Sequence, residues 1–207
     1  ALGVETILHS NDSGIAEQHA QKLAKEQGKI YVSPYNDPQI IAGQGTLAIE
    51  LLDQLPRLDV VYVSIGGGGL ISGIGSVLKA FSPKTRVVGV SAKNSAELAA
   101  SIRAGKMVKV DHHETLADGC AGGVDSDTIT LGLGSEVIDD LIDCSEVQIE
   151  SGLQQIAWSE KMLVEGSAGL AYAAWQEDAR KNKNKISAVV LCGANFDKET
   201  LSPIFNS

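Results

Sequence analysis

Four consecutive glycines at residues 66–69 are the part of this sequence whose residue types and spacing point most directly to chemistry. They follow the apolar run 60–65, which is typical of a buried strand, and precede residues 70–80, which are predicted to form a helix. Backbone N–H groups without side chains can converge on a phosphate, and the start of a helix adds partial positive charge. We therefore predict a phosphate-binding loop. The alternative is a tight strand-to-helix turn, although four glycines exceed what such a turn requires.

Two classes of phosphate ligand compete for this loop. Gly67, Gly69 and Gly73 loosely match the dinucleotide fingerprint, which requires an acidic residue near the end of the next strand to bind a ribose. That position holds Ser91, although Lys93 would suit a 2′-phosphate, so an NAD(P)-binding oxidoreductase domain stays an alternative. A Walker A nucleotide loop is excluded because no Gly-Lys-Ser/Thr follows the glycines.

Strands and helices alternate along the predicted chain. This alternation predicts an α/β fold with an open, mostly parallel sheet and helices on both faces, which binds ligands at the carboxyl ends of its strands. Strands are predicted at residues 4–9, 30–32, 60–65, 87–90 and 188–192. Helices are predicted from an N-cap among Asn11, Asp12 and Ser13 to Gly28, and at 40–55, 70–80, 96–104, 136–141, 150–163 and 168–179.

Composition limits the classes of protein that this chain can be. It has 207 residues, of which 22 are glycine, and 43% of the residues are hydrophobic, so one or two folded domains are expected. The turn-rich segment 34–38 is predicted to separate a domain at 1–33 from one at 34–207. A net charge of −9 argues against nonspecific binding to nucleic acid and against attraction to an anionic membrane.

Neither a membrane span nor a secreted disulfide framework is indicated. The uncharged run 60–78 has the length of a membrane helix, but six of its residues are glycine, so it is predicted to be a strand and a helix joined by a loop. The cysteines, Cys120, Cys144 and Cys192, are odd in number and widely spaced. With no signal peptide visible, a reducing cytoplasm is the expected location.

Five motifs occur in an order that resembles the fold type II pyridoxal-phosphate enzymes, specifically the threonine and serine dehydratase and serine racemase group. They are Ile-Ala-Gly-Gln-Gly-Thr at 41–46, Gly-Gly-Gly-Gly-Leu at 66–70, Leu-Ala-Asp-Gly at 116–119, Val-Glu-Gly-Ser-Ala-Gly at 164–169 and Leu-Cys-Gly-Ala-Asn at 191–195. The resemblance implies a tryptophan-synthase-β-like fold, of which this chain is the C-terminal majority. Residues 1–33 would be the remainder of the smaller domain, and 34–207 most of the larger one.

The resemblance also implies a pyridoxal 5′-phosphate site. In the family, the glycine loop cradles the cofactor phosphate, the residue at Cys192 faces the pyridine nitrogen, and Glu165 and Gly119 lie beside the ring. The residues themselves leave two alternatives open: Cys192 as a small hydrophobe that ends a strand, and Glu165 as a charge at a helix N-terminus. The predicted cofactor-binding residues are Gly66, Gly67, Gly68, Gly69, Leu70, Gly119, Glu165 and Cys192.

The lysine that the family uses for its Schiff base is not found in this chain. The family places it in a Ser-x-Lys-x-Arg-Gly segment, and the Ser-x-Lys matches at 82–84, 91–93 and 159–161 do not continue with Arg-Gly. We therefore expect this chain alone to be a catalytically inactive fragment. Open sheet edges and exposed apolar surface would favour a homodimer or association with the missing N-terminal segment.

No metal site is expected. Family members that bind a divalent cation use a carboxylate where this chain has Ser91, and the nearest remaining acid is Glu97. Asp111, His112, His113 and Glu114 are close in sequence, but they are interpreted as a solvated loop rather than as ligands.

By this resemblance, the parent enzyme would eliminate water and ammonia from L-threonine or L-serine to give a 2-oxo acid. The alternatives are a serine racemase-type amino-acid racemase, a non-catalytic phosphate-binding remnant and, as above, an NAD(P)-binding oxidoreductase domain. The expected partner is a small amino-acid substrate.

Overall fold

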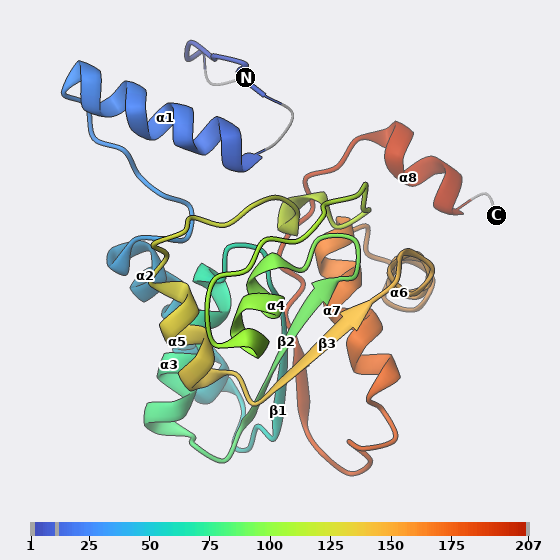
Figure 1. Ribbon diagram of the computed structural model, residues 1–207. Helices are drawn as coiled ribbons and strands as arrows, with labels where there is room; N and C mark the ends of the chain where they lie inside the picture. The colour runs from blue at the N-terminus through green and yellow to red at the C-terminus, as the bar shows by residue number, and fades with distance from the viewer. Residues whose placement is uncertain (1–2, 11–12, 206–207) are drawn as a thin grey trace.

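A computed structural model describes residues 3–10 and 13–205 of the chain (Figure 1). Within these residues, a four-stranded sheet has the order β3-β2-β1-β4, and every neighbouring pair is parallel. This confirms the predicted α/β class. The strands are β1 (Val60–Ser64), β2 (Arg86–Ala92), β3 (Asp140–Cys144) and β4 (Ser187–Val189).

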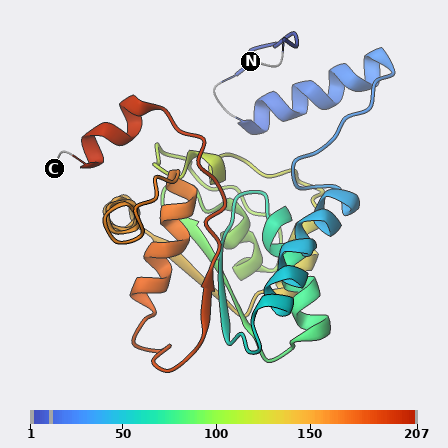
Figure 2. The same cartoon turned by 180° about the vertical axis from the view of Figure 1, so that it is seen from behind.

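Helices cover both faces of the sheet, because successive residues of the buried strands point to opposite sides. In β1, Val60 and Tyr62 belong to one hydrophobic core and Val61 and Val63 to the other. Figures 1 and 2 show the two helical layers on either side of the sheet. One layer contains α2 (Pro38–Gln54), α3 (Gly69–Phe81), α4 (Glu97–Ala104) and α5 (Thr130–Val137), and the other α6 (Glu146–Gln155), α7 (Gly166–Glu177) and α8 (Lys198–Phe205).

Local signals explain where several helices begin. Asp37 caps α2 by accepting hydrogen bonds from the N–H groups of Gln39 and Ile40, at 2.7 and 3.2 Å, and Pro38 occupies the first helical position. Ser145 and Gln148 form a capping box at the start of α6. The charge-free run 60–78 is β1 followed by α3, as predicted, and within the described residues no helix is both long and apolar enough to cross a membrane.

The predicted helix at 136–141 is wrong. Helix α5 ends at Val137, and β3 begins at Asp140 and pairs with β2 along its whole length. Arg86 of β2 binds Asp140 at 2.7 Å across this pair. Local periodicity missed the strand because β3 lies at the sheet edge and carries acidic side chains. Asp140 pairs with Arg86 of β2, and Asp143 pairs with Arg103 of α4, so the charges of β3 are neutralised by residues distant in sequence.

The predicted strands at 4–9 and 30–32 do not form; both segments are irregular and lie outside the sheet. Leu8 and Ile30 are almost fully exposed, so no sheet partner covers them. Between these segments, α1 (Ser13–Gln27) has no buried residue and lies above the carboxyl ends of the strands (Figures 1 and 2). It touches the main body through side chains, since Ser13 donates to the Ala121 carbonyl at 3.3 Å and Gln21 donates to Asp125 at 3.3 Å. Asn11 and Asp12, offered as N-caps of this helix, lie outside the described residues.

The helix predicted at 150–163 starts earlier, at Glu146, and ends earlier. A π-helical turn at Ile156–Glu160 follows α6, and Lys161, with φ of 60°, stops the helix. Sequence patterning also missed α8, which buries Leu201 and Ile204 against the α6–α7 layer.

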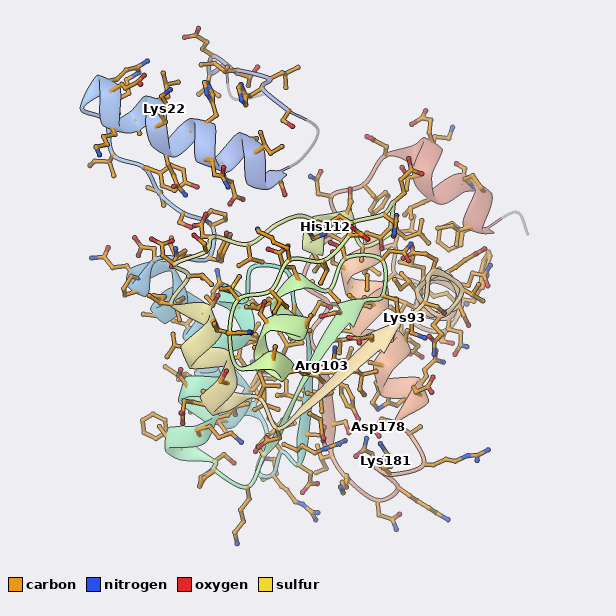
Figure 3. The ribbon with its side chains drawn as sticks, viewed as in Figure 1. Lys22, Lys93, Arg103, His112, Asp178 and Lys181 are labelled. Atoms are coloured by element: carbon orange, nitrogen blue, oxygen red, sulfur yellow. The ribbon has the colours of Figure 1, made fainter. Side chains whose placement is uncertain are left out.

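A buried polar network lies at the amino ends of the strands, far from the carboxyl ends (Figure 3). Asp178 accepts hydrogen bonds from Arg86, from the Tyr62 hydroxyl at 2.9 Å and from Lys181 at 3.0 Å. Although burial alone would raise the pKa of Asp178, these hydrogen bonds lower it to about 2. The unfolded carboxyl keeps its ordinary pKa near 3.8, so ionised Asp178 stabilises the fold above that pH, and the contribution is lost as pH falls towards 2.

We predict that Asp178→Asn destabilises the chain by about 2 kcal/mol at pH 7, because it leaves the Arg86 charge without its buried partner. Urea unfolding at pH 7 and at pH 3 measures this. The difference in free energy of unfolding between Asp178→Asn and the unsubstituted chain should be smaller at pH 3 than at pH 7. Asp53→Asn, on the exposed face of α2, is the matched control. A difference that is the same at both pH values would contradict the assignment.

Candidate functional site

A cavity of about 790 Å³ opens at the carboxyl ends of the strands, between β1 and β4. The sheet order reverses at this pair, since β2 and β3 continue to one side of β1 and β4 lies on the other. Such a reversal point is where open α/β sheets bind ligands. The residues after β1 and those after β4 form two of its walls, and Ser13 and Glu17 of α1 also line it.

The glycine loop forms one wall, and its neighbours pack so closely that side chains would not fit. A Cβ atom on Gly67 would lie 2.2 Å from Cγ of Tyr35, and one on Gly68 would lie 2.3 Å from Cδ2 of Leu98. A Cβ on Gly66 would meet the backbone of Cys120 at 3.0 Å. The predicted loop therefore needs glycine for space.

Gly68 also needs glycine for its backbone, because its φ is +86° where it caps α3. Thr130 holds the loop from outside by donating its hydroxyl to the carbonyl oxygen of Gly67 at 2.7 Å. No described residue accepts a hydrogen bond from the backbone N–H groups of residues 66–70. These unpaired donors, together with the N-terminal end of α3, suit an anion.

Glu165, Gly119 and Cys192 also line the cavity. Glu165 precedes α7 and ties down the segment after β4: its N–H donates to the Gly193 carbonyl at 3.1 Å, and its Oε2 accepts the Asn195 N–H at 2.9 Å. A Cβ on Gly119 would lie 3.2 Å from Glu165 Oε1, so glycine at this position gives the Glu165 carboxylate the space that it occupies. Glu165 thus acts as a loop anchor as well as a wall residue.

The cysteines at the cavity are held in the neutral thiol form. Surrounding protein disfavours the Cys192 thiolate, and the nearby charge of Glu165 adds to this, so the pKa of Cys192 is raised. Burial raises the pKa of Cys120 to about 12. At neutral pH each thiol can therefore act as a neutral hydrogen-bonding group but is a poor nucleophile.

The structure brings all of the predicted cofactor residues to this one cavity. Its lining residues include Gly66, Gly67, Gly68, Gly69, Leu70, Gly119, Glu165 and Cys192. None of the described residues that line the cavity is a lysine. In the described part of the chain, no group of three or more His, Cys, Asp and Glu side chains is placed to hold a metal ion.

Sequence analysis missed several residues that shape the cavity. Tyr35 packs its ring on Gly67 and accepts the Asp125 N–H at its hydroxyl, at 2.9 Å. Ser64 donates to the carbonyl of Ser167 at 2.6 Å, while the buried hydroxyl of Ser167 has no hydrogen-bond partner among residues 3–10 and 13–205. The sequence predicts a turn-rich connector at 34–38. Within it, the aromatic residue Tyr35 is the one local feature that favours a packing role.

Comparison with known proteins decides the family. Residues 1–193 match the family described as pyridoxal-phosphate dependent enzyme. The chain belongs to this family. The cavity fits the cofactor, because its unpaired backbone donors and Cβ-free surface suit a phosphate monoester.

Among characterised relatives, L-threonine ammonia-lyase of Thermotoga maritima is 34% identical over 99% of this chain and 51% of its own length. The catabolic L-threonine dehydratase of Escherichia coli K12 is 33% identical over 97% of this chain and 61% of its own length. The chain therefore spans only about half to three fifths of these relatives.

Solved structures agree on the fold. The processed form of threonine deaminase isoform 2 from Solanum lycopersicum superposes with a TM-score of 0.88 at 29% identity, covering 99% of this chain and 60% of that one. Maize serine racemase gives a TM-score of 0.85 at 29% identity, covering 97% of this chain and 62% of that one. These similarities confirm the predicted resemblance and the fold class.

We predict that Gly67→Ala destabilises the chain by about 2 kcal/mol, because the new methyl group overlaps the Tyr35 ring. Urea unfolding measures the cost. In a Tyr35→Ala background the same substitution should cost less than half as much, since the overlap is gone. Gly43→Ala, where a Cβ meets nothing within 4 Å, is the control. Equal costs in both backgrounds would show that the ring does not constrain Gly67.

Proposed function

We propose that this chain supplies the phosphate-binding domain of a pyridoxal-phosphate enzyme that eliminates water and ammonia from L-threonine or L-serine to give a 2-oxo acid. One observation carries the proposal: the unpaired N–H groups of residues 66–70 line the same cavity as the other predicted cofactor residues. The names of the relatives, a threonine ammonia-lyase and a threonine dehydratase, support the reaction class.

The cavity geometry supports the roles proposed for the glycine loop, Gly119 and Glu165, and the resemblance to the family supports the role proposed for Cys192. The N–H groups of residues 66–70 hold the cofactor phosphate, and Gly119 leaves room beside Glu165 for the ring. Glu165 fixes the segment after β4 on which Cys192 lies. When bound, pyridoxal phosphate supplies the electron sink for loss of the substrate α-proton. A neutral Cys192 thiol facing the pyridine nitrogen would not stabilise a full positive charge there as a carboxylate would.

We propose further that this chain alone binds the cofactor without catalysing the reaction. No lysine is among the described residues that line the cavity, and no Ser-x-Lys-x-Arg-Gly segment occurs in the sequence. A complete site then requires a lysine from polypeptide beyond these residues. The second candidate is an amino-acid racemase, which the similarity to maize serine racemase supports.

The proposal extends to organisation and partners. Residues 1–33 are proposed to belong to the smaller domain and 34–207 to the larger one, because α1 buries none of its residues against the body. Strand β4 pairs only with β1 and is an open edge in the described sheet. A second copy or the polypeptide that completes the enzyme would cover this edge, in a protein of the cytoplasm.

We predict that the chain binds pyridoxal 5′-phosphate and that Gly68→Asp reduces the affinity at least about tenfold, because it places a carboxylate and a strained backbone in the cradle. Equilibrium dialysis measures binding, with inorganic phosphate as competitor. Gly132→Asp adds the same charge at an exposed position with open space around it, and it should bind like the unsubstituted chain.

Several results would overturn parts of this proposal. Binding of NADP without binding of pyridoxal phosphate would favour the oxidoreductase alternative. Unchanged affinity in Gly68→Asp would remove the phosphate role of the loop. Borohydride reduction followed by mass spectrometry should leave no labelled lysine, and a specific adduct on a lysine of this chain would contradict the proposed lack of catalytic capacity.

A further inference from the structure

A second polar cluster, outside the predicted cofactor residues, connects α4 to a wall of the cavity. Its centre is Glu97, the first residue of α4, whose side chain is only 1% exposed. Oε1 of Glu97 accepts the Val124 N–H at 3.0 Å and faces the Lys109 ammonium at 3.0 Å. Oε2 contacts Nε2 of His112 at 3.1 Å. Figure 3 shows His112 at the carboxyl end of the sheet, the end that carries the cavity.

The hydrogen-bond directions in this cluster follow from the chemistry of its groups. An ionised carboxylate only accepts, so Nε2 of His112 must donate to Glu97. In the neutral imidazole Nδ1 is then an acceptor, and it receives the Ser95 hydroxyl at 2.8 Å. The Ser95 oxygen in turn accepts the Gly122 N–H at 3.0 Å. The relay therefore ends on the backbone of the cavity wall.

Glu97 stays ionised in this buried position. Burial alone would raise the pKa of its carboxyl, but hydrogen bonds from the Val124 N–H, Lys109 and His112 lower the pKa below its ordinary value. Charge-assisted hydrogen bonds of this kind are stronger than neutral ones. The cluster can thus hold residues 122–124 firmly.

The start of α4 also contacts the glycine loop. The Leu98 side chain packs against Gly68 at the place where a Cβ would lie 2.3 Å from its Cδ2. The first turn of α4 therefore contacts the glycine loop through Leu98 and Val124 through Glu97, and Ser95, just before the helix, contacts Gly122. Because the glycine loop and residues 118–123 both line the cavity, this turn links two of its lining segments.

We propose that Glu97 is a positioning residue of the cofactor site. Together with Lys109 and the His112–Ser95 relay, it fixes residues 122–124 relative to the glycine loop and so determines how tightly the cavity holds its phosphate ligand. The effect on ligand affinity rests on the proposed function. The effect on residues 122–124 does not, because it can be measured in the chain without any ligand.

The test compares matched pairs of variants in the full chain. Glu97→Gln removes the buried charge, and Asp111→Asn removes an exposed charge from the irregular segment that carries His112. Hydrogen exchange of the Gly122 and Val124 amides is measured without ligand, and the affinity for pyridoxal 5′-phosphate is measured by dialysis. We expect Glu97→Gln to accelerate exchange and weaken binding by about tenfold each, the equivalent of one charge-assisted hydrogen bond. Asp111→Asn should change each by less than about twofold.

A second pair keeps the test decisive if Glu97→Gln does not fold. His112→Asn breaks the relay at a less buried position, and His113→Asn is its exposed neighbour. We expect only His112→Asn to accelerate exchange at Gly122. The 15N shifts of His112 in the unsubstituted chain should report a proton on Nε2, and Ser95→Ala should perturb its Nδ1 signal.

The outcomes separate this inference from the proposed function. Faster exchange at residues 122–124 with no binding of pyridoxal phosphate by the unsubstituted chain would retain the positioning role and refute the cofactor. Binding by the unsubstituted chain with neither exchange nor affinity altered in Glu97→Gln and His112→Asn would refute the positioning role. A loss of affinity without faster exchange would refute it as well.

Discussion

The rest of the site depends on one constraint, which is that the loop after β1 must expose its backbone N–H groups to the cavity. A side chain at Gly67 or Gly68 would overlap Tyr35 or Leu98, so the loop can pack against its neighbours and still leave its donors unpaired. Backbone donors that no described residue pairs, at a helix N-terminus beside an open cavity, suit an anion from outside the chain.

The charges of the molecule are arranged around this requirement. At the amino ends of the strands, Arg86 and Asp178 neutralise each other within a buried network. At the carboxyl ends, the Glu97 charge is met by Lys109 and His112, behind the cavity wall rather than inside the cavity. Among the described residues that line the cavity there is no lysine or arginine, and its acidic residues are Glu17, Asp118 and Glu165. The hydrogen-bond donors that the loop offers are therefore backbone N–H groups.

Sequence patterns predicted the centre of this fold better than its edges. The unit formed by β1, the glycine loop and α3 is contiguous in sequence, and its apolar runs are buried. Local composition was therefore sufficient to predict this strand, loop and helix. Strand β3 was mistaken for a helix because its half-exposed residues gain their strand character from pairing with β2 and from the Arg86–Asp140 ion pair. The segments 4–9 and 30–32 look like strands in composition, but the described sheet provides no partner for them.

The sequence by itself determined the family, through five motifs in order, and the position of the closely packed glycine loop, for which anion binding stays a prediction. The tertiary structure alone decided which residues support that loop. Tyr35 reaches Gly67, and Glu97 reaches Val124, across 32 and 27 positions of chain. Such contacts arise from the packing of whole elements and from the need to pair every buried charge, and neither leaves a local pattern in the sequence.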